Sequence, residues 1–223
     1  MDHEKNIKKL KLSSLERSFK KNFSILDNNS TIIGSLVPIG HWLLDDLEII
    51  DKISQWRTKF NRMFPTRNKV TRETTLNYIN KNYISNDRSI LFLIYTPEKK
   101  LVGHVGLSNF NKKSFELVNL IRGASGGADE LIYFAESALL NFGFSIGNQT
   151  ECFIELMSYN WIVKDLHERI GFKKISSHPL QKLLSNDSVT HLKVSNQQKN
   201  VSYTTDIYSI TKKDFYKRKI HSK

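Results

Sequence analysis

The feature that most constrains the fold is a block of three short apolar segments joined by two tight turns. The first segment, residues 89–95, is a continuous apolar run with the length of a buried strand. A turn beginning at Pro97 leads to residues 101–109, and a turn beginning at Asn111 leads to residues 115–122. Connections this short join neighbouring antiparallel strands. The block therefore predicts an antiparallel meander.

Amphipathic helical patterns and further strands surround this block. Residues 41–63 carry large apolar side chains at steps of two to four, which predicts a helix with one bend or break. Thr71 opens a second helix with a near capping box. Further helices are expected at about 128–146 and 160–170, and further strands at 31–39, 151–157, 172–176 and 202–210. The predicted fold is α/β (α+β), with a mixed, largely antiparallel central sheet flanked by helices.

The positive charge of the chain is concentrated at its two ends. Of a formal net charge of +12, residues 1–22 carry +4 and residues 211–223 carry +5. We therefore expect a basic N-terminal arm over 1–30, one domain over 31–210 with a polar, irregular loop at 177–200, and a basic C-terminal tail. Such ends favour an anionic neighbour, such as nucleic acid, a membrane surface or a phosphorylated substrate, with solvated tails as the alternative. Lys (25) far outnumbers Arg (9), which argues against a dedicated nucleic-acid reader.

Composition excludes several other classes of protein. The single cysteine, Cys152, excludes an internal disulfide, and its apolar surroundings predict a buried, inert thiol. No group of His, Asp and Glu has metal-ligand spacing, so no metal is expected. No apolar run approaches the roughly 20 residues that span a bilayer, and no apolar signal-peptide core is present. These features predict a cytoplasmic protein.

A glycine cluster at residues 123–127 joins the third strand of the meander to the long helix. A helix N-terminus offers unpaired backbone N–H groups and the positive end of the helix dipole, which suits a pyrophosphate. No Gly-Lys-Ser/Thr follows, so this is not a Walker loop. The preceding strands are joined by hairpins, which argues against a dinucleotide-binding fingerprint. A purely structural strand-to-helix turn is the alternative.

Three segments resemble motifs of the GNAT superfamily of acyl-CoA-dependent N-acyltransferases. Residues 103–107 (GHVGL) look like its Gly-x-x-Gly-Leu strand. Residues 122–128 (RGASGGA) look like its Arg/Gln-x-x-Gly-x-Gly/Ala loop, although Ser125 stands where a Gly belongs. Residues 160–172 (NWIVKDLHERIGF) are similar to its Asn-x-x-Ala-x-x-Leu-Tyr-Glu-Lys-x-Gly-Phe segment. The resemblance implies a GNAT-like fold, with acetyl-CoA as co-substrate and transfer of its acetyl group to a primary amine.

The resemblance places coenzyme A at the end of the third strand and on the glycine loop. Asp129 and Glu130 open the following helix, where they would compete with a bound pyrophosphate unless they point away. The expected cofactor-binding residues are Leu120, Ile121, Arg122, Gly123, Ser125, Gly126, Gly127, Ala128 and Asn160.

Acetyl transfer needs groups that deprotonate the amine, polarise the carbonyl and protonate the leaving thiolate. His167 occupies the position of the family's Tyr and is the candidate acid; a surface helix residue is the alternative. Glu116 matches a Glu that many members carry as base, and His104 on the neighbouring strand is its rival. Either of these two could instead be a structural residue. Simple alternation places Glu116 and Asn119 on opposite faces of their strand, unless a bulge intervenes.

The expected substrate-binding residues are Trp56, Arg57, Tyr78 and Asn119. Core packing is the alternative role for the first three. Residues 115–123 are closest to members that acetylate nucleotide-linked amino sugars, and an anionic acceptor suits a basic protein. Trp56 and Arg57, followed by the Thr-capped helix at 71, resemble the branch that acetylates ribosomal-protein N-termini and also sugar-modifying relatives. A protein N-terminus is the alternative acceptor. A nucleic-acid-associated or catalytically inactive GNAT-like binding protein is the alternative from another class. The loop at 177–200 could cover the acceptor site or form a homodimer.

Overall fold

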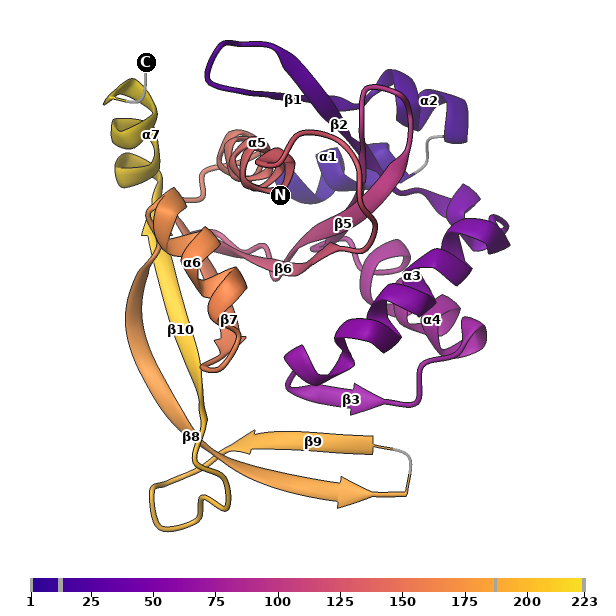
Figure 1. Ribbon diagram of the computed structural model, residues 1–223. Coiled ribbons are helices and arrows are strands. Elements are labelled where there is room, and N and C mark those ends of the chain that lie inside the picture. Colours follow the sequence, from indigo (N-terminus) through magenta and orange to yellow (C-terminus); the bar gives the residue numbers. More distant parts are fainter. Residues whose placement is uncertain (1, 12–13, 187, 222–223) are drawn as a thin grey trace.

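The computed structural model describes residues 2–11, 14–186 and 188–221 (Figure 1). Within these ranges ten strands form one sheet, in the order β1-β2-β4-β5-β6-β7-β10-β8-β9-β3. The strands are β1 (Phe23–Leu26), β2 (Ile32–Pro38), β3 (Thr66–Asn68), β4 (Ile90–Tyr95), β5 (Leu101–Ser108), β6 (Ser114–Arg122), β7 (Glu151–Met157), β8 (Lys173–Ser185), β9 (Ser188–Lys193) and β10 (Thr204–Thr211). The described strand pairs are antiparallel except β6 with β7, which is parallel.

Helices cover both faces of this sheet. The α-helices are α1 (Asp2–Lys11), α2 (Leu15–Lys20), α3 (Leu47–Phe60), α4 (Arg72–Ile79), α5 (Leu131–Ser145), α6 (Trp161–Ile170) and α7 (Lys212–His221), and the short turns are η1 (His41–Leu44), η2 (Asn61–Met63) and η3 (Asn80–Ile84). One apolar cluster contains the buried face of α5, and a second contains those of α3 and η3. The expected mixed, largely antiparallel sheet flanked by helices is therefore confirmed.

The central meander forms as its sequence predicts. β4, β5 and β6 are consecutive antiparallel neighbours, and every residue of β4 is buried. The helical region 41–63 is broken once, between η1 and α3, and Thr71 caps α4 in a capping box with Thr74. These elements form where their local patterns place them because apolar period and capping agree there.

The expected N-terminal arm is wrong, because residues 1–30 contribute α1, α2 and β1 to the fold. Ile7 of α1 and Ile25 of β1 are fully buried in the core. The Trp42 indole donates a hydrogen bond of 3.1 Å to the hydroxyl of Ser18 in α2. The basic side chains dominate the composition of this segment, but a few apolar residues anchor it.

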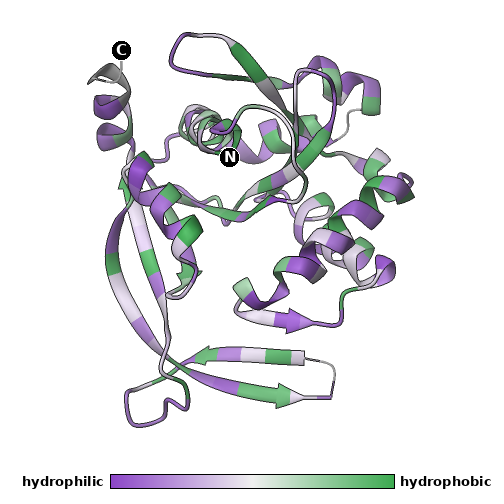
Figure 2. Cartoon of the chain, in the orientation of Figure 1, coloured by the Kyte–Doolittle hydropathy of each residue, from purple (hydrophilic) through white to green (hydrophobic). Residues whose placement is uncertain are grey.

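The expected C-terminal tail, residues 211–223, is likewise helical over α7. Phe215 is buried in the core, and the Lys212 ammonium donates a 2.8 Å hydrogen bond to the Phe144 carbonyl of α5. Much of the ribbon of α7 is hydrophilic (Figure 2), and the contact with the core is made by Phe215 and by the partly buried Tyr216 beside it. No helix in the described ranges is long and apolar enough to cross a membrane.

The segment expected as an irregular loop, residues 177–200, is largely a β-hairpin. β8 continues to Ser185 and β9 returns beside it, and β9 then pairs with β3 far back in the sequence (Figure 1). The His191 imidazole contacts the Pro65 carbonyl at 2.7 Å and the Tyr203 hydroxyl at 2.8 Å. The sequence did not predict this hairpin, because much of its surface faces solvent and its composition is therefore polar, like that of a loop.

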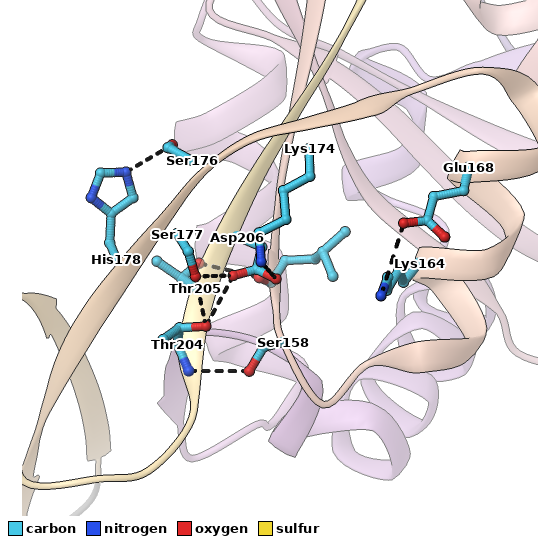
Figure 3. A network of polar contacts seen from close by, with 11 residues as sticks. Ser158, Lys164, Glu168, Lys174, Ser176, Ser177, His178, Thr204, Thr205 and Asp206 are labelled. Carbon is cyan, nitrogen blue, oxygen red and sulfur yellow. Dashed lines mark hydrogen bonds and ion pairs between the residues drawn. The ribbon is translucent and has the colours of Figure 1, made fainter.

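A polar network ties β8 to β10 around Asp206, which is only 4% exposed (Figure 3). Its carboxylate accepts hydrogen bonds from Lys174 (2.7 Å), Ser177 (2.5 Å) and Thr204 (2.9 Å). Burial disfavours the charged carboxylate, but the hydrogen bonds from these three partners outweigh it and lower the pKa of Asp206.

We expect Asp206→Asn to lower the free energy of unfolding at neutral pH by about 1–3 kcal/mol, the scale of a hydrogen bond to a charged group. Because the folded-state pKa is lowered, the carboxylate stabilises the fold above the ordinary Asp pKa, and this contribution is lost as the pH falls. The difference from wild type in urea unfolding should therefore shrink on acidification. Asp45→Asn, at an exposed carboxylate, is the matched control. A difference unchanged down to about pH 3 would contradict the prediction.

Candidate functional site

The candidate site opens where β6 and β7 separate. The two strands pair over three residues only, and the last pair is Glu116 with Phe153. Beyond it, β6 follows β5 and β7 follows β10. Two parallel neighbours that separate leave a gap in the middle of a sheet, where a ligand can lie against backbone groups from both sides.

A cavity of about 720 Å³ occupies this gap, within the ordinary range of small-molecule sites. Its walls come from β6, β7, α6 and the segment around η2. The lining residues are Phe60, Met63, Phe64, Pro65, Glu116, Leu117, Val118, Asn119, Leu120, Ile121, Arg122, Ile132, Ile154, Glu155, Leu156, Asn160, Ile162, Val163, Asp165, Leu166, His167 and Arg169.

A β-bulge interrupts β6 beside the cavity. His104 pairs with Ile121 and Gly106 with Val118, so two residues of β6 stand opposite one of β5. Asn119 lies in this bulge with a positive φ of 54°. The bulge overrides simple alternation along the strand, so Asn119 and Glu116 both line the cavity.

The bulge brings together side chains from β6, α3, α4 and η3. The Asn119 amide donates a 2.6 Å hydrogen bond to the Tyr78 hydroxyl and a second to the Tyr83 hydroxyl. Arg57 donates a hydrogen bond of 3.2 Å to Oδ1, the side-chain carbonyl oxygen of Asn119. The Arg57 guanidinium lies 4.3 Å from the centre of the Tyr78 ring. A half-buried guanidinium beside the cavity wall is a group that could recognise a carboxylate or phosphate.

The glycine loop presents backbone donors at the end of β6. Gly126 and Gly127 have φ values of 122° and 72°, a region that favours glycine. Arg122 donates hydrogen bonds to the carbonyls of Gly126 (3.2 Å) and Asp129 (3.1 Å), which holds the loop in place. Among the described residues, the backbone N–H groups of residues 125–130 have no protein acceptor. This cradle fits the phosphates of coenzyme A.

Glu130 is engaged by an ion pair at the start of α5. Its carboxylate accepts a hydrogen bond from Arg169 of α6, and the Arg169 guanidinium also lies 5.0 Å from the centre of the Tyr133 ring. The charge of Glu130, one of the two carboxylates that could compete with a bound phosphate, is thus paired with a neighbouring cation.

His167, in the last turn of α6, is buried, with 3% of its surface exposed, and lines the cavity. It is therefore not a surface helix residue. Its Nδ1 lies 2.6 Å from the Oε1 atom of Glu136 in α5, and Glu136 is fully buried. The Phe172 ring packs edge-on against the imidazole, with 5.5 Å between the ring centres. One nitrogen and one face of the imidazole are thus held by the protein.

The two candidate bases lie in different surroundings. Glu116 lines the cavity at the last β6–β7 pair, and its carboxylate accepts a 2.8 Å hydrogen bond from Asn109. His104 is 1% exposed, stacks on the Trp56 ring and is not among the lining residues. Burial, together with the charge of Arg57, lowers the pKa of His104 to about 3.

The structure thus brings together part of the predicted site. The predicted residues that line the cavity are Glu116, Asn119, Leu120, Ile121, Arg122, Asn160 and His167. The predicted residues outside the lining are Trp56, Arg57, Tyr78, His104, Gly123, Ser125, Gly126, Gly127 and Ala128. The last five form the loop that follows the lining residue Arg122.

Sequence reasoning missed Glu136, Glu155 and Arg169. The burial of Glu136 could have been predicted, because Glu136 stands four residues after Ile132 and four before Leu140, both of which are buried. A carboxylate within an apolar helical stripe predicts a buried partner. Glu155 is paired with Lys193 of β9 at 2.8 Å, a contact that only the hairpin creates.

Cys152 is fully buried, and burial raises the pKa of its thiol well above the ordinary value. No group of three or more His, Cys, Asp or Glu side chains in the described ranges is arranged to hold a metal ion.

Comparisons with known proteins add an independent line of evidence. No protein-family model and no curated protein matches this sequence. Among solved structures, Apo FdhC, a nucleotide-linked sugar GNAT, is 18% identical, with a TM-score of 0.60 over 90% of this chain and 96% of its own. The spermidine N-acetyltransferase from Vibrio cholerae, in complex with CoA and spermine, is 16% identical, with a TM-score of 0.63 over 83% and 99%.

A third similar structure is an acetyl transferase from Salmonella typhimurium that modifies the N-terminal serine of ribosomal protein L7/L12. It is 11% identical, with a TM-score of 0.61 over 81% of this chain and 96% of its own. The three similar proteins are named for different substrates, so what they have in common with this chain is the path of the backbone.

Proposed function

Since the chain has the fold of the GNAT acyltransferases, we propose that it is an N-acetyltransferase that moves an acetyl group from acetyl-CoA to a primary amine. One observation carries the proposal. The cavity between the separating strands β6 and β7 is lined by the Glu116 carboxylate, the His167 imidazole and Arg122. Arg122 directly precedes the loop whose backbone N–H groups, at residues 125–130, have no described protein acceptor. These are the groups that acyl transfer from an anionic thioester requires.

We assign the co-substrate to residues that fit its chemistry. The N–H groups of residues 125–130 would bind the pyrophosphate, and the apolar walls of β6 and β7 would hold its pantetheine arm. When bound, acetyl-CoA supplies an activated acetyl group as a thioester. Glu116, at the point of separation, would accept a proton from the amine directly or through water. His167 would donate a proton to the leaving sulfur.

We propose a small anionic acceptor, such as a nucleotide-linked amino sugar. Arg57 supports this acceptor because its guanidinium lies beside the bulge that lines the cavity. The formal net charge of +12 also favours attraction of anionic ligands. A protein N-terminus is the second candidate. It would rest on the apolar residues Phe60, Met63 and Phe64, which line the same side of the cavity.

We expect acetyl-CoA to stabilise the folded protein. A ligand that binds only the folded state adds about 2.7 kcal/mol at one hundred times its Kd. The measurement is a thermal melt with and without acetyl-CoA, with free acetate and adenosine as control ligands. An unchanged melting temperature at millimolar acetyl-CoA, in a folded sample, would contradict the proposed activity.

The acceptor is tested by release of free thiol from acetyl-CoA in a panel of amines. The panel contains a nucleotide-linked amino sugar, the same amino sugar without the nucleotide, spermidine and a short peptide with a free N-terminus. Faster turnover of the nucleotide-linked sugar than of the free sugar supports the anionic acceptor. Arg57→Gln should remove this preference, whereas turnover of spermidine or the peptide alone would overturn it.

A further inference from the structure

Glu136 is a carboxylate in the interior of the protein with one described partner. It lies in the middle of α5 and is fully buried. Its Oε1 contacts Nδ1 of His167 at 2.6 Å, and its Oε2 has no hydrogen-bond partner among the described residues. A buried carboxylate is costly to keep, and replacing such pairs with apolar residues is often neutral or stabilising. Core packing therefore does not explain a Glu at this position.

The partner of Glu136 is the residue that faces the cavity. His167 lines the cavity from α6, and with Nδ1 engaged by the carboxylate only Nε2 remains for a ligand. Opposite an ionised Glu136, which accepts hydrogen bonds and cannot donate one, Nδ1 carries a proton. Contact with Phe172 further restrains the orientation of the ring.

We propose that Glu136 is a positioning residue that holds His167 in the Nδ1–H form, so that Nε2 exchanges a proton with the leaving group in the cavity. This inference rests on the proposed acetyl transfer and adds a carboxylate–imidazole pair to it. The same division of roles, in which a buried acid orients a histidine and stabilises its charged form, operates in the catalytic triads of serine hydrolases.

The proton balance of the reaction is complete with these groups. The neutral amine forms the new N–C bond to the acetyl carbonyl carbon, and the C–S bond breaks with its electron pair going to sulfur. The amine nitrogen gives one proton to Glu116, and the protonated imidazole gives one from Nε2 to sulfur. His167 then remains neutral with its proton on Nδ1, facing Glu136. Exchange with water returns both residues to their starting states.

The first test observes the imidazole of the full-length protein directly and needs no turnover. Nitrogen-15 NMR of His167 in the neutral ring should show a protonated Nδ1 and an unprotonated Nε2. In Glu136→Gln the side-chain amide can donate to Nδ1, so we expect the proton to move to Nε2. A wild-type ring protonated at Nε2 alone would overturn the proposal.

The second test is kinetic. We expect Glu136→Gln to lower kcat by about one to two orders of magnitude while KM for acetyl-CoA changes less than about threefold. In a His167→Phe background, the same substitution should cause no further loss, because Glu136 acts only through the imidazole. A further loss of kcat of similar size in that background would overturn the proposal.

Glu168→Gln is the matched control, because Glu168 is the carboxylate adjacent to His167 in sequence but pairs with Lys164 on the exposed face of α6. It should leave kcat and the His167 spectrum unchanged. If Glu136→Gln does not fold, the nitrogen-15 spectrum of wild-type His167 tests the proposal by itself. If that spectrum is as expected but the protein neither binds nor turns over acetyl-CoA, the carboxylate–imidazole pair stands and the proposed function is overturned.

Discussion

His167→Ala should lower kcat by about 10²- to 10⁴-fold, the usual contribution of a general acid, with little change in KM for acetyl-CoA. The imidazole is buried at the cavity wall, and the structure gives it a carboxylate partner at Nδ1, so its free nitrogen is available to the leaving sulfur. The residues proposed to hold the pantetheine arm and the pyrophosphate are others, which is why we expect binding to persist. Steady-state kinetics with a free-thiol readout measures both parameters.

His167→Tyr is the informative companion, since Tyr is the usual residue of the family segment that residues 160–172 resemble. We expect it to retain much of the activity, because a phenol can also donate a proton to sulfur. Wild-type kcat in His167→Ala would show that the thiolate leaves without help from this residue.

Gly123→Ala should raise the Kd for acetyl-CoA at least about tenfold and lower stability by about 1–3 kcal/mol, the cost of overpacking. A Cβ on Gly123 would lie 1.9 Å from Cδ2 of the Trp56 ring, and that ring is 7% exposed and cannot swing away. The loop must therefore shift, and with it the unpaired N–H groups of residues 125–130. Isothermal titration with acetyl-CoA and urea unfolding measure the two effects.

Gly147→Ala is a matched glycine control, because its Cβ would meet the end of the Gln149 side chain, which belongs neither to the glycine loop nor to the cavity lining. It should leave acetyl-CoA binding unchanged. An acetyl-CoA affinity in Gly123→Ala equal to wild type would show that the loop tolerates the shift, and that its backbone N–H groups do not set the affinity.

The sequence predicts elements well where one short stretch contains the whole signal. The β4–β6 meander, the capping box at Thr71 and the helix that ends at Gly171 are local patterns of this kind. The N-terminal helices and the β8–β9 hairpin were missed because their few apolar residues gain partners only in the tertiary structure. Charge and polarity dominate their composition, and composition alone does not show which apolar residues become buried.

The candidate site shows the same division. Glu116, Arg122 and His167 were predicted from their places in motifs, and all three line the cavity. The contact between Glu136 and His167 spans 31 positions and two helices, so no local pattern contains it. The sequence leaves room for a bulge near Asn119 but does not predict one, because alternation along a strand does not show where an extra residue is inserted.

The short pairing of β9 with β3 joins two distant parts of the chain at the side of the cavity that Pro65 lines. His191 and Pro65, which meet there, are 126 positions apart, and only three residue pairs join the two strands. Pro65 is itself part of the cavity wall, and Lys193 of β9 also contacts the lining residue Glu155. Local unfolding costs the least free energy in segments that make few contacts, and the β3–β9 junction is such a segment. Release of this junction would therefore widen the cavity at Pro65 while the β4–β6 meander stays folded.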